Sequence, residues 1–391
     1  MTVKEFDPYV TPILDDEPYP IYKTLRDESP LYHDERYDLW VLSRFEDVQS
    51  AMRDWQTFSQ EPGVDIDGHG RALIGAGDIL DMDPPRHDEL RALVRRTRTF
   101  APKNIQALAP KIKDLVEGFV DTFIDRGEAD LATEFTYPLP LRMGPELIGF
   151  PVEDLPRLDE WHSASMIRNV GDPELPPSAV EGARKVQEYI GELVAERRRR
   201  PREDLVSEIV SAELDGQRLA DEAVGLVFIL FVASIDTTSG LISNSLLHLE
   251  RHPEQRAMLA GDPALIPNAV EEMLRYDSPV QFNARTATRD VEMNGQRVPK
   301  GARVIVLFGS ANRDERQFED PDRLDVTRKI RRHLGFGEGI HHCIGAPLAR
   351  LESRVALETL LTRIPEYGIT APVERMTKQN LRGLTSLPVA F

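Results

Sequence analysis

Apolar residues recur at helical spacing over four long stretches of the chain. These stretches are residues 105–126, 179–200, 221–250 and 347–364, where apolar side chains return every three or four positions, as one face of a helix requires. The stretch 221–250 is almost wholly apolar in its first half, a pattern typical of a helix that runs through a protein core. The pattern therefore predicts a mainly α-helical protein.

Shorter apolar runs indicate a few strands. Residues 39–42, 291–293 and 304–308 are each short and mostly apolar, and a turn-forming Asn294-Gly295 pair separates the last two. Runs of this length and number cannot build a large sheet. We therefore expect a small β portion beside the helices.

Residues 61–82 differ from both patterns. They contain five glycines and show no period, so we expect a long irregular loop, which in a compact domain is more often functional than not. No internal repeat, low-complexity segment or linker is evident elsewhere. The sequence thus predicts a single domain over residues 1–391.

Composition and charge exclude several classes of function. Of the 391 residues, 41% are apolar and 29% charged, which is typical of a globular protein with a large core. The formal net charge of −18 argues against general nucleic-acid binding. The first residues lack the apolar stretch of a signal peptide, and the apolar run 223–233 is too short to span a bilayer. We expect a cytoplasmic protein without a membrane anchor.

The only cysteine of the chain, Cys343, lies in a glycine-rich stretch. Gly335, Gly337 and Gly339 precede it, and Gly345 follows, just before a helical pattern begins. Glycines let the backbone approach a flat ligand closely, and backbone N–H groups at a helix N-terminus favour a thiolate. The arrangement suits a metal ligand, although a lone cysteine is more often a small buried core residue.

Three further motifs are weak when each is taken alone. Asp236-Thr237 stands in the middle of the apolar helix, where a buried carboxylate must find partners, and an acid beside an alcohol can relay protons. Glu272 and Arg275 share one helix face, as do His87 and Arg91, a combination that can bind an anion. A satisfied polar kink and ordinary solvated ion pairs would explain the same residues.

Taken together, in this order and at these separations, the motifs closely resemble the haem-thiolate cytochrome P-450 monooxygenases of the soluble bacterial type. The resemblance covers essentially the whole chain. It is most specific in the cysteine loop, where Phe336, Gly339, Cys343 and Gly345 match the family pattern Phe-x-x-Gly-x-x-x-Cys-x-Gly. The implied fold is mainly α with a small β portion, and haem b lies between the long oxygen-activating helix and the cysteine loop.

The resemblance also implies roles for single residues. Cys343 would be the axial thiolate of the haem iron, Asp236 and Thr237 the acid and alcohol that serve oxygen activation, and Glu272 with Arg275 a buried structural pair. The positions that hold the haem propionates in such proteins are matched by His87, Arg91, Arg285 and His341.

The implied reaction inserts one oxygen atom from O2 into a small or mid-sized organic substrate, by hydroxylation or oxidative dealkylation. Electrons would come from NAD(P)H through a ferredoxin reductase and a ferredoxin. A cluster of basic residues could dock an acidic ferredoxin by electrostatic attraction. Its members are Arg95, Arg96, Arg98, Lys329, Arg331, Arg332 and Arg350.

One departure from the family concerns the substrate side. The family usually has glycine two residues before the acid, where this chain has Ser234, and we expect its side chain to project toward the pocket. Further pocket candidates come from the loop 61–82, from residues 166–170 and 384–387, and from single residues of the core helix and the strand region. These are Phe231, Ile235, Val280, Gln281, Phe282 and Asn283.

Other interpretations remain. A peroxide-using relative would generally lack the intact acid-alcohol pair, and a haem sensor would more often use histidine and carry an output domain. A zinc site at His333, His341, His342 and Cys343 would have ligands closer together than the usual paired spacing. A dinucleotide-binding loop is opposed by the lack of a buried strand before the glycines.

Overall fold

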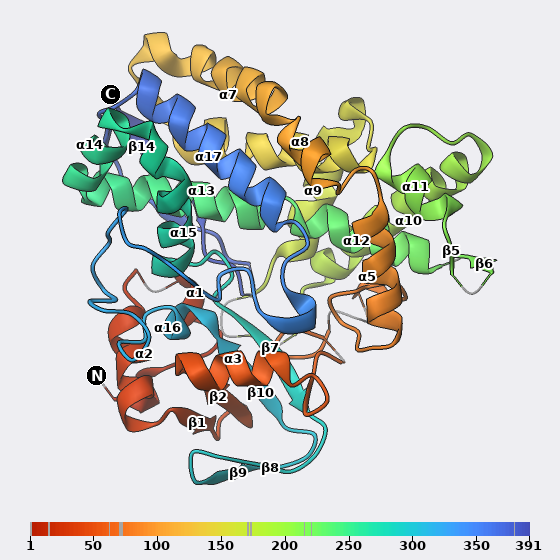
Figure 1. Cartoon of the computed structure of the whole chain (residues 1–391), viewed down its shortest axis with the longest axis vertical. Coiled ribbons are helices and arrows are strands. Elements are labelled where there is room, and N and C mark those ends of the chain that lie inside the picture. The colour runs from red at the N-terminus through yellow and green to blue at the C-terminus, as the bar shows by residue number, and fades with distance from the viewer. Residues whose placement is uncertain are drawn as a thin grey trace.

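The structure is a computed structural model that describes residues 2–14, 16–61, 63–69, 73–169, 172, 174–214, 216–219, 221–378 and 380–391. Helices make up most of it, as the apolar periodicity predicts (Figure 1). The helices are α1 (Thr11–Leu14), α2 (Tyr19–Glu28), α3 (Phe45–Arg53), α5 (Arg86–Arg96), α6 (Pro102–Gln106), α7 (Ala109–Phe123), α8 (Pro138–Ile148), α9 (Leu155–Met166), α10 (Pro177–Arg199), α11 (Leu205–Ser211), α12 (Glu222–Ala233), α13 (Asp236–Arg251), α14 (Pro253–Gly261), α15 (Ile266–Tyr276), α16 (Phe308–Ala311) and α17 (Ala346–Arg363).

The β portion is small. Its strands are β1 (Leu31–Asp34), β2 (Leu39–Leu42), β3 (Phe58–Ser59), β4 (Glu128–Asp130), β5 (Glu213–Leu214), β6 (Gln217–Arg218), β7 (Phe282–Ala287), β8 (Val291–Met293), β9 (Gln296–Val298), β10 (Arg303–Leu307), β11 (Gly368–Ile369), β12 (Glu374–Arg375), β13 (Leu384–Ser386) and β14 (Pro388–Ala390). The largest sheet among the described residues has the order β1-β2-β10-β7-β3, and only the β2–β10 pair is parallel.

Helix α13 runs through the middle of the molecule and packs against α15 and α17 (Figure 1). Its apolar residues, such as Leu246, join a large core cluster that also takes in Leu357 of α17. Burial of this kind stabilises a fold by about 25 cal/mol per Å² of apolar surface. The cysteine loop leads into α17, so this packing fixes where Cys343 lies.

The predicted helix 221–250 is divided into α12 and α13, because Ser234 and Ile235 lie in a turn between them. Two hydroxyls accompany the break: Ser234 Oγ donates to the Phe231 carbonyl at 2.7 Å, and Thr237 Oγ1 donates to the Ala233 carbonyl at 2.9 Å. Hydroxyls that bond back to a preceding carbonyl commonly bend helices. The threonines after Asp236 suggest a local break in the helix, but the sequence does not predict that it lies at Ser234 and Ile235.

The stretch Glu222–Arg251 is long and apolar enough to cross a membrane by length and composition, and its most apolar window has a mean hydropathy of 1.9. However, 72% of its most apolar window is buried inside the protein. It is therefore accounted for as the core helix of the fold.

Candidate functional site

The cysteine loop packs against the C-terminal end of α3. Gly339 has φ +71°, and a Cβ added there would lie 2.8 Å from the Met52 carbonyl oxygen. Both facts require glycine at this position. The Cys343 N–H donates to the Phe336 carbonyl at 2.8 Å, which closes the loop. Gly345 then stands at the N-cap of α17.

The Cys343 thiol faces the start of α17. Burial raises its pKa, whereas hydrogen bonds from the backbone N–H groups of Gly345 and Ala346 and the positive charges of Arg91 and Arg350 lower it. The side chain is half-buried, and no disulfide is possible. Burial prevails, so the pKa of the free Cys343 thiol lies above its usual value, while the backbone N–H groups and the two arginines are placed to support the anionic form that a thiolate ligand needs.

His87 of α5, His341 of the cysteine loop and Arg285 of β7 form what we call the open cluster, because its buried donors lack partners. The His87 and His341 rings are 4.3 Å apart between centroids, and neither Nε2 atom has a hydrogen-bond partner. The only hydrogen bond of the Arg285 side chain within the described part of the chain is to the carbonyl of Ala284, at 2.9 Å.

Burial dominates the electrostatics of the open cluster, in which Asp88 reaches only Nδ1 of His87. Burial lowers the pKa of Arg285 to about 9, although Asp83 and Asp81 oppose this. Burial, Arg285, His87 and Arg91 together lower the pKa of His341 to about 2. A buried guanidinium without a carboxylate is costly, and a carboxylate group here would also pair the free Nε2 atoms. The open cluster therefore suits a ligand that carries carboxylates.

Arg91 lies on the same helix as His87 and connects the two halves of the site. Its Nη2 donates to the carbonyl of His342. Burial and Arg95 lower its pKa, and the Cys343 and Asp88 charges raise it. The structure thus brings all four predicted propionate-binding residues to the neighbourhood of the cysteine loop.

Asp236 is buried between two side chains, His162 and Lys378, that the sequence did not single out. Its Oδ2 is 3.0 Å from His162 Nε2, and its Oδ1 is 2.6 Å from Lys378 Nζ. Burial alone would raise the pKa of Asp236, but His162 and Lys378 outweigh it and lower the pKa to about 2. A lone histidine in α9 and a lysine in the C-terminal tail carry no motif, so tertiary structure alone brings them here.

Thr237 follows Asp236 and lies on a helix face that is not covered by other parts of the protein. Ala233 is exposed and Thr237 is half-buried, in the middle of an otherwise buried helical stretch. The two are four residues apart, so they share one face. This face can meet a ligand.

Ser234 does not project as we expected. A Cβ added to Gly144 of α8 would lie 2.3 Å from Ser234 Oγ, so the hydroxyl lies directly against α8. Its hydrogen bond to the Phe231 carbonyl holds it there. The expectation that Ser234 enters the pocket is wrong, because the turn before α13 directs the side chain onto the neighbouring helix.

Most of the other pocket candidates are core residues. Phe231 packs on Phe150 at 4.8 Å between centroids and is fully buried, as are Ile235 and Phe282. The Gln281 amide is internal, since its Nε2 donates to the Ser278 carbonyl at 2.7 Å and its Oε1 accepts from Tyr22 at 3.0 Å. Phe231, Ile235 and Gln281 thus pack in the core, and Phe282 also lines a cleft described below, so their pocket role stays a prediction.

The remaining pocket candidates divide in the same way. Val280 and Asn283 keep partial exposure, whereas Leu384 and Leu387 are buried in the main core. Of the stretch 166–170, residue 170 lies outside the described residues. Parts of residues 61–69 and 168–169 line a common cleft, to which we return below.

Glu272 and Arg275 of α15 form a fully buried ion pair. Arg275 Nε and Nη2 lie 2.7 and 2.8 Å from the two Glu272 oxygens, and Arg275 Nη1 donates to the carbonyls of Asn312 and Pro321. Glu272 also accepts from the Asp325 N–H at 3.0 Å. Together Glu272 and Arg275 are called the closed pair below.

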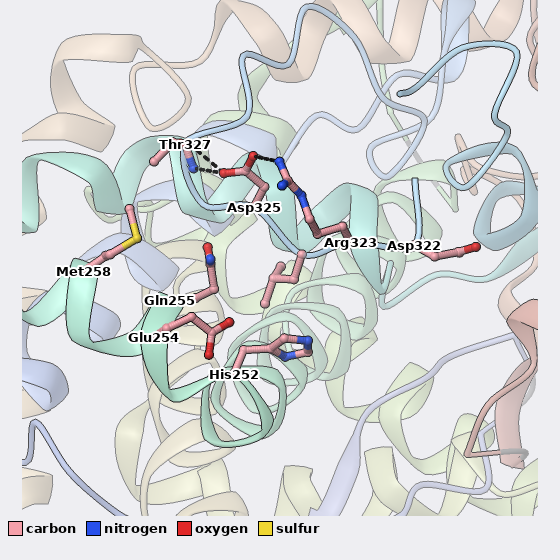
Figure 2. A pocket seen from close by; sticks show the side chains of 9 residues that line it. His252, Glu254, Gln255, Met258, Asp322, Arg323, Asp325 and Thr327 are labelled. Atoms are coloured by element: carbon pink, nitrogen blue, oxygen red, sulfur yellow. Dashed lines mark hydrogen bonds and ion pairs between the residues drawn. The ribbon is translucent and has the colours of Figure 1, made fainter. Parts of the chain in front are cut away.

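A surface hollow of about 560 Å³ lies between α14 and the segment that contains Asp325 (Figure 2). Its lining is mostly polar, and Asp325 is hydrogen-bonded there to Thr327 and Arg323. None of the residues that line it is a predicted site residue. The hollow is therefore separate from the chemistry described above.

The basic cluster is only partly free. Arg95, Arg96, Arg98, Lys329 and Arg331 are exposed, and their side chains have no ion pair within the described ranges. Arg332 is 3.9 Å from Glu338. Arg350 is instead bound to Glu271 at 2.6 Å and stacked on Phe336, so its main role in the structure is to brace the cysteine loop.

The zinc interpretation finds no support. Within the residues that the structure describes, no group of three or more His, Cys, Asp or Glu side chains is arranged to hold a metal ion. His333 pairs with Glu271 at 3.0 Å, and His342 is exposed.

Comparison with known proteins agrees with this geometry. The family model described as Cytochrome P450 matches residues 264–364. The chain is 38% identical over 402 residues to a putative cytochrome P450 123 of Mycobacterium bovis, covering 100% of this chain and 99% of that protein. It is 36% identical over 375 residues to the cyclomarin C epoxidase CymV of Salinispora arenicola, covering 94% of each.

Solved structures are similar as well. The crystal structure of HmtN, a post-tailoring hydroxylase of himastatin biosynthesis, has a TM-score of 0.84 at 38% identity, covering 94% of this chain and 95% of that one. Identity at this level over nearly the full length of both chains defines the family. The chain belongs to the cytochrome P450 family and is a P450 monooxygenase, an enzyme class whose cofactor is a haem held by a cysteine thiolate.

Proposed function

We propose that residues 1–391 act as one catalytic domain that binds haem b and inserts one oxygen atom from O2 into a small or mid-sized organic substrate. Hydroxylation and oxidative dealkylation are the expected outcomes. The observation that carries the proposal is the open cluster, whose unpaired buried donors lie beside the loop of the only cysteine. Among the relatives, one named as an epoxidase and one as a hydroxylase also support oxygen insertion.

The residues present fit a haem. The Cys343 sulfur, supported by two backbone N–H groups, would bind the haem iron, and Phe336, Gly339 and Gly345 shape its loop. His87, Arg91, Arg285 and His341 would hold the propionates, because the Nε2 atoms of both histidines lack a partner and Arg285 bonds only to a carbonyl within the described residues. When bound, the haem supplies the oxidising chemistry, and the protein supplies binding, orientation and electrostatics.

Asp236 and Thr237 serve proton supply on the open helix face. Lys378 is 12% exposed at its side chain and its Nζ lies 2.6 Å from Asp236 Oδ1, so it connects the buried acid to the surface. The Thr237 hydroxyl is held by the Ala233 carbonyl on the face that can meet a ligand. A positioned acid of this kind contributes about 10²–10⁴-fold to a rate.

The thiolate assignment is tested by Cys343→Ser. We expect the variant to lose the carbon monoxide absorption band that is characteristic of thiolate-bound haem, together with product formation. Thr362→Ala, at the exposed end of α17, is the matched control and should keep both. An unchanged band in Cys343→Ser would remove the basis of the proposal.

Electrons are proposed to come from NAD(P)H through a ferredoxin reductase and a ferredoxin, in the cytoplasm. The unpaired arginines Arg95, Arg96 and Arg331 lie on the two segments that flank the cysteine loop, α5 and the chain before Phe336. Electrostatic attraction of an acidic partner raises association rates and weakens with salt.

Docking is tested by the salt dependence of the first electron transfer. Replacing Arg95 and Arg96 by Gln should slow this step at low ionic strength and flatten its dependence on salt. Arg199→Gln, an exposed arginine at the end of α10, should change neither. A rate independent of salt in the unaltered protein would contradict electrostatic docking.

A further inference from the structure

A small cleft brings together segments that are distant in the sequence. Ile66 and Asp67 of the long loop, Arg168 after α9, Phe282 of β7 and Thr377 of the C-terminal tail all line it. Its volume is about 40 Å³, more than the roughly 10–15 Å³ that a single buried water needs. The cleft therefore has room for one small functional group.

Arg168 is the only cationic side chain that lines the cleft within the described part of the chain. Its Nη1 donates to the carbonyls of Ser165 and Ile167, at 3.1 and 2.8 Å, so one role of Arg168 is to cap the end of α9. Among the residues that the structure describes, its Nε and Nη2 atoms have no hydrogen-bond partner, and no carboxylate lies within ion-pair distance of the guanidinium. Capping of α9 thus leaves two nitrogen atoms of the Arg168 guanidinium available to a ligand.

Carboxylates near the cleft decide which ligand the free donors suit. Burial lowers the pKa of Arg168, while the negative charges of Asp65 and Asp67 raise it. Asp67 accepts a hydrogen bond from Tyr9 at 2.5 Å, and Asp172 also lines the cleft. A further carboxylate would be repelled by these acids, whereas a neutral carbonyl would accept from Arg168 without that cost.

Part of the lining is apolar, and one lining residue is next in the chain to a residue that contacts Asp236. One wall of the cleft is apolar and consists of Ile13, Leu14, Ile66 and Phe282. The Arg168 N–H donates to the Thr377 carbonyl at 3.4 Å, and the next residue, Lys378, contacts Asp236. One short segment of the C-terminal tail thus contributes Thr377 to the cleft wall and Lys378 to the Asp236 contact.

We propose that the cleft binds the outer end of the substrate and that Arg168 selects a neutral carbonyl there, such as that of an amide, ester or lactone on an apolar body. This assignment rests on the proposed function, since it places the other end of the substrate on the open face of Ala233 and Thr237. Arg168 is thus a specificity-determining residue.

Three matched probes test the assignment on the haem-loaded protein: decanamide, decanoate and decane. Binding is followed by the shift of the haem Soret band and by the rise in thermal midpoint. We expect decanamide to bind about 10-fold more tightly than decane, the size of a hydrogen bond to a charged donor. Arg168→Met should remove this preference and leave decane binding unchanged. Arg157→Met, within α9 and bound to Asp154, should keep it.

The other outcomes each overturn the assignment. Tighter binding of decanoate that depends on Arg168 would make the cleft an anion site. Equal binding of all probes in both proteins would leave only water in the cleft, and failure of decanamide to bind would exclude a carbonyl subsite. Arg168→Met should keep the carbon monoxide band of the unaltered protein, so these failures are distinguishable from failure of the thiolate assignment.

Discussion

Arg275 and Arg285 are both fully buried, yet they have opposite surroundings. Arg275 forms two hydrogen bonds to Glu272, and carbonyl groups take its other donors. Arg285 has the carbonyl of Ala284 and no carboxylate. A buried ion pair with satisfied donors is stable within the protein itself, whereas a buried unpaired charge requires a ligand. Equal burial can therefore mark either a folding element or a binding site, and the partner atoms decide which.

Breaking the closed pair should have the largest effect. Glu272→Gln leaves the Arg275 charge buried without its counter-charge, so we expect the free energy of unfolding to fall by about 3–5 kcal/mol. The loss should be similar with and without haem, because the pair does not belong to the open cluster. Denaturant unfolding of both forms measures it. The control Glu181→Gln, in an exposed ion pair, should leave the free energy of unfolding almost unchanged.

Removing the Arg285 charge should change the free energy of unfolding in opposite directions in the haem-free and the haem-loaded protein. Arg285→Met replaces an uncompensated buried cation by an apolar side chain, so we expect the haem-free protein to gain about 1–4 kcal/mol of stability. The haem-loaded protein should lose stability instead, since a charge-assisted hydrogen bond is lost. Unfolding of both forms gives the two signs. A loss in the haem-free form would mean that Arg285 already has a partner.

A smaller effect should appear in the pH dependence of the open cluster. Burial lowers the pKa of His87 below its usual value, although Asp88 opposes this. The folded chain then binds fewer protons than the unfolded chain below about pH 6.5, so stability falls as the pH decreases through this range, by up to about 1.4 kcal/mol per pH unit.

His87→Gln should remove this part of the pH dependence in the haem-free protein, as measured by thermal unfolding between pH 7 and pH 5. Haem carboxylates favour the protonated ring, so the haem-loaded protein should show a weaker dependence than the haem-free one. His33→Gln, beside Asp38, is the control and should leave the dependence in place. Identical profiles in both forms would contradict an anion at His87.

The sequence predicted the elements whose signals are local. The helices and the β portion follow from apolar period, and the loop pattern at Phe336, Gly339 and Cys343 is specific enough to identify the family. It could not predict that His162 and Lys378 hold Asp236, because neither lies in a motif and both are far from Asp236 in the chain. The sequence also could not predict where the Ser234 side chain points, because a turn between α12 and α13 sets its direction.

The contact between Ser234 and Gly144 has a consequence for how such proteins can vary. A Cβ at position 144 would overlap the hydroxyl oxygen, so neither position can enlarge without the other becoming smaller. We expect the two positions to change together among relatives: chains with glycine in place of Ser234 should tolerate alanine in place of Gly144, and chains with serine should not. This crossing of α8 with the α12–α13 turn would then appear in a sequence alignment as a compensating pair.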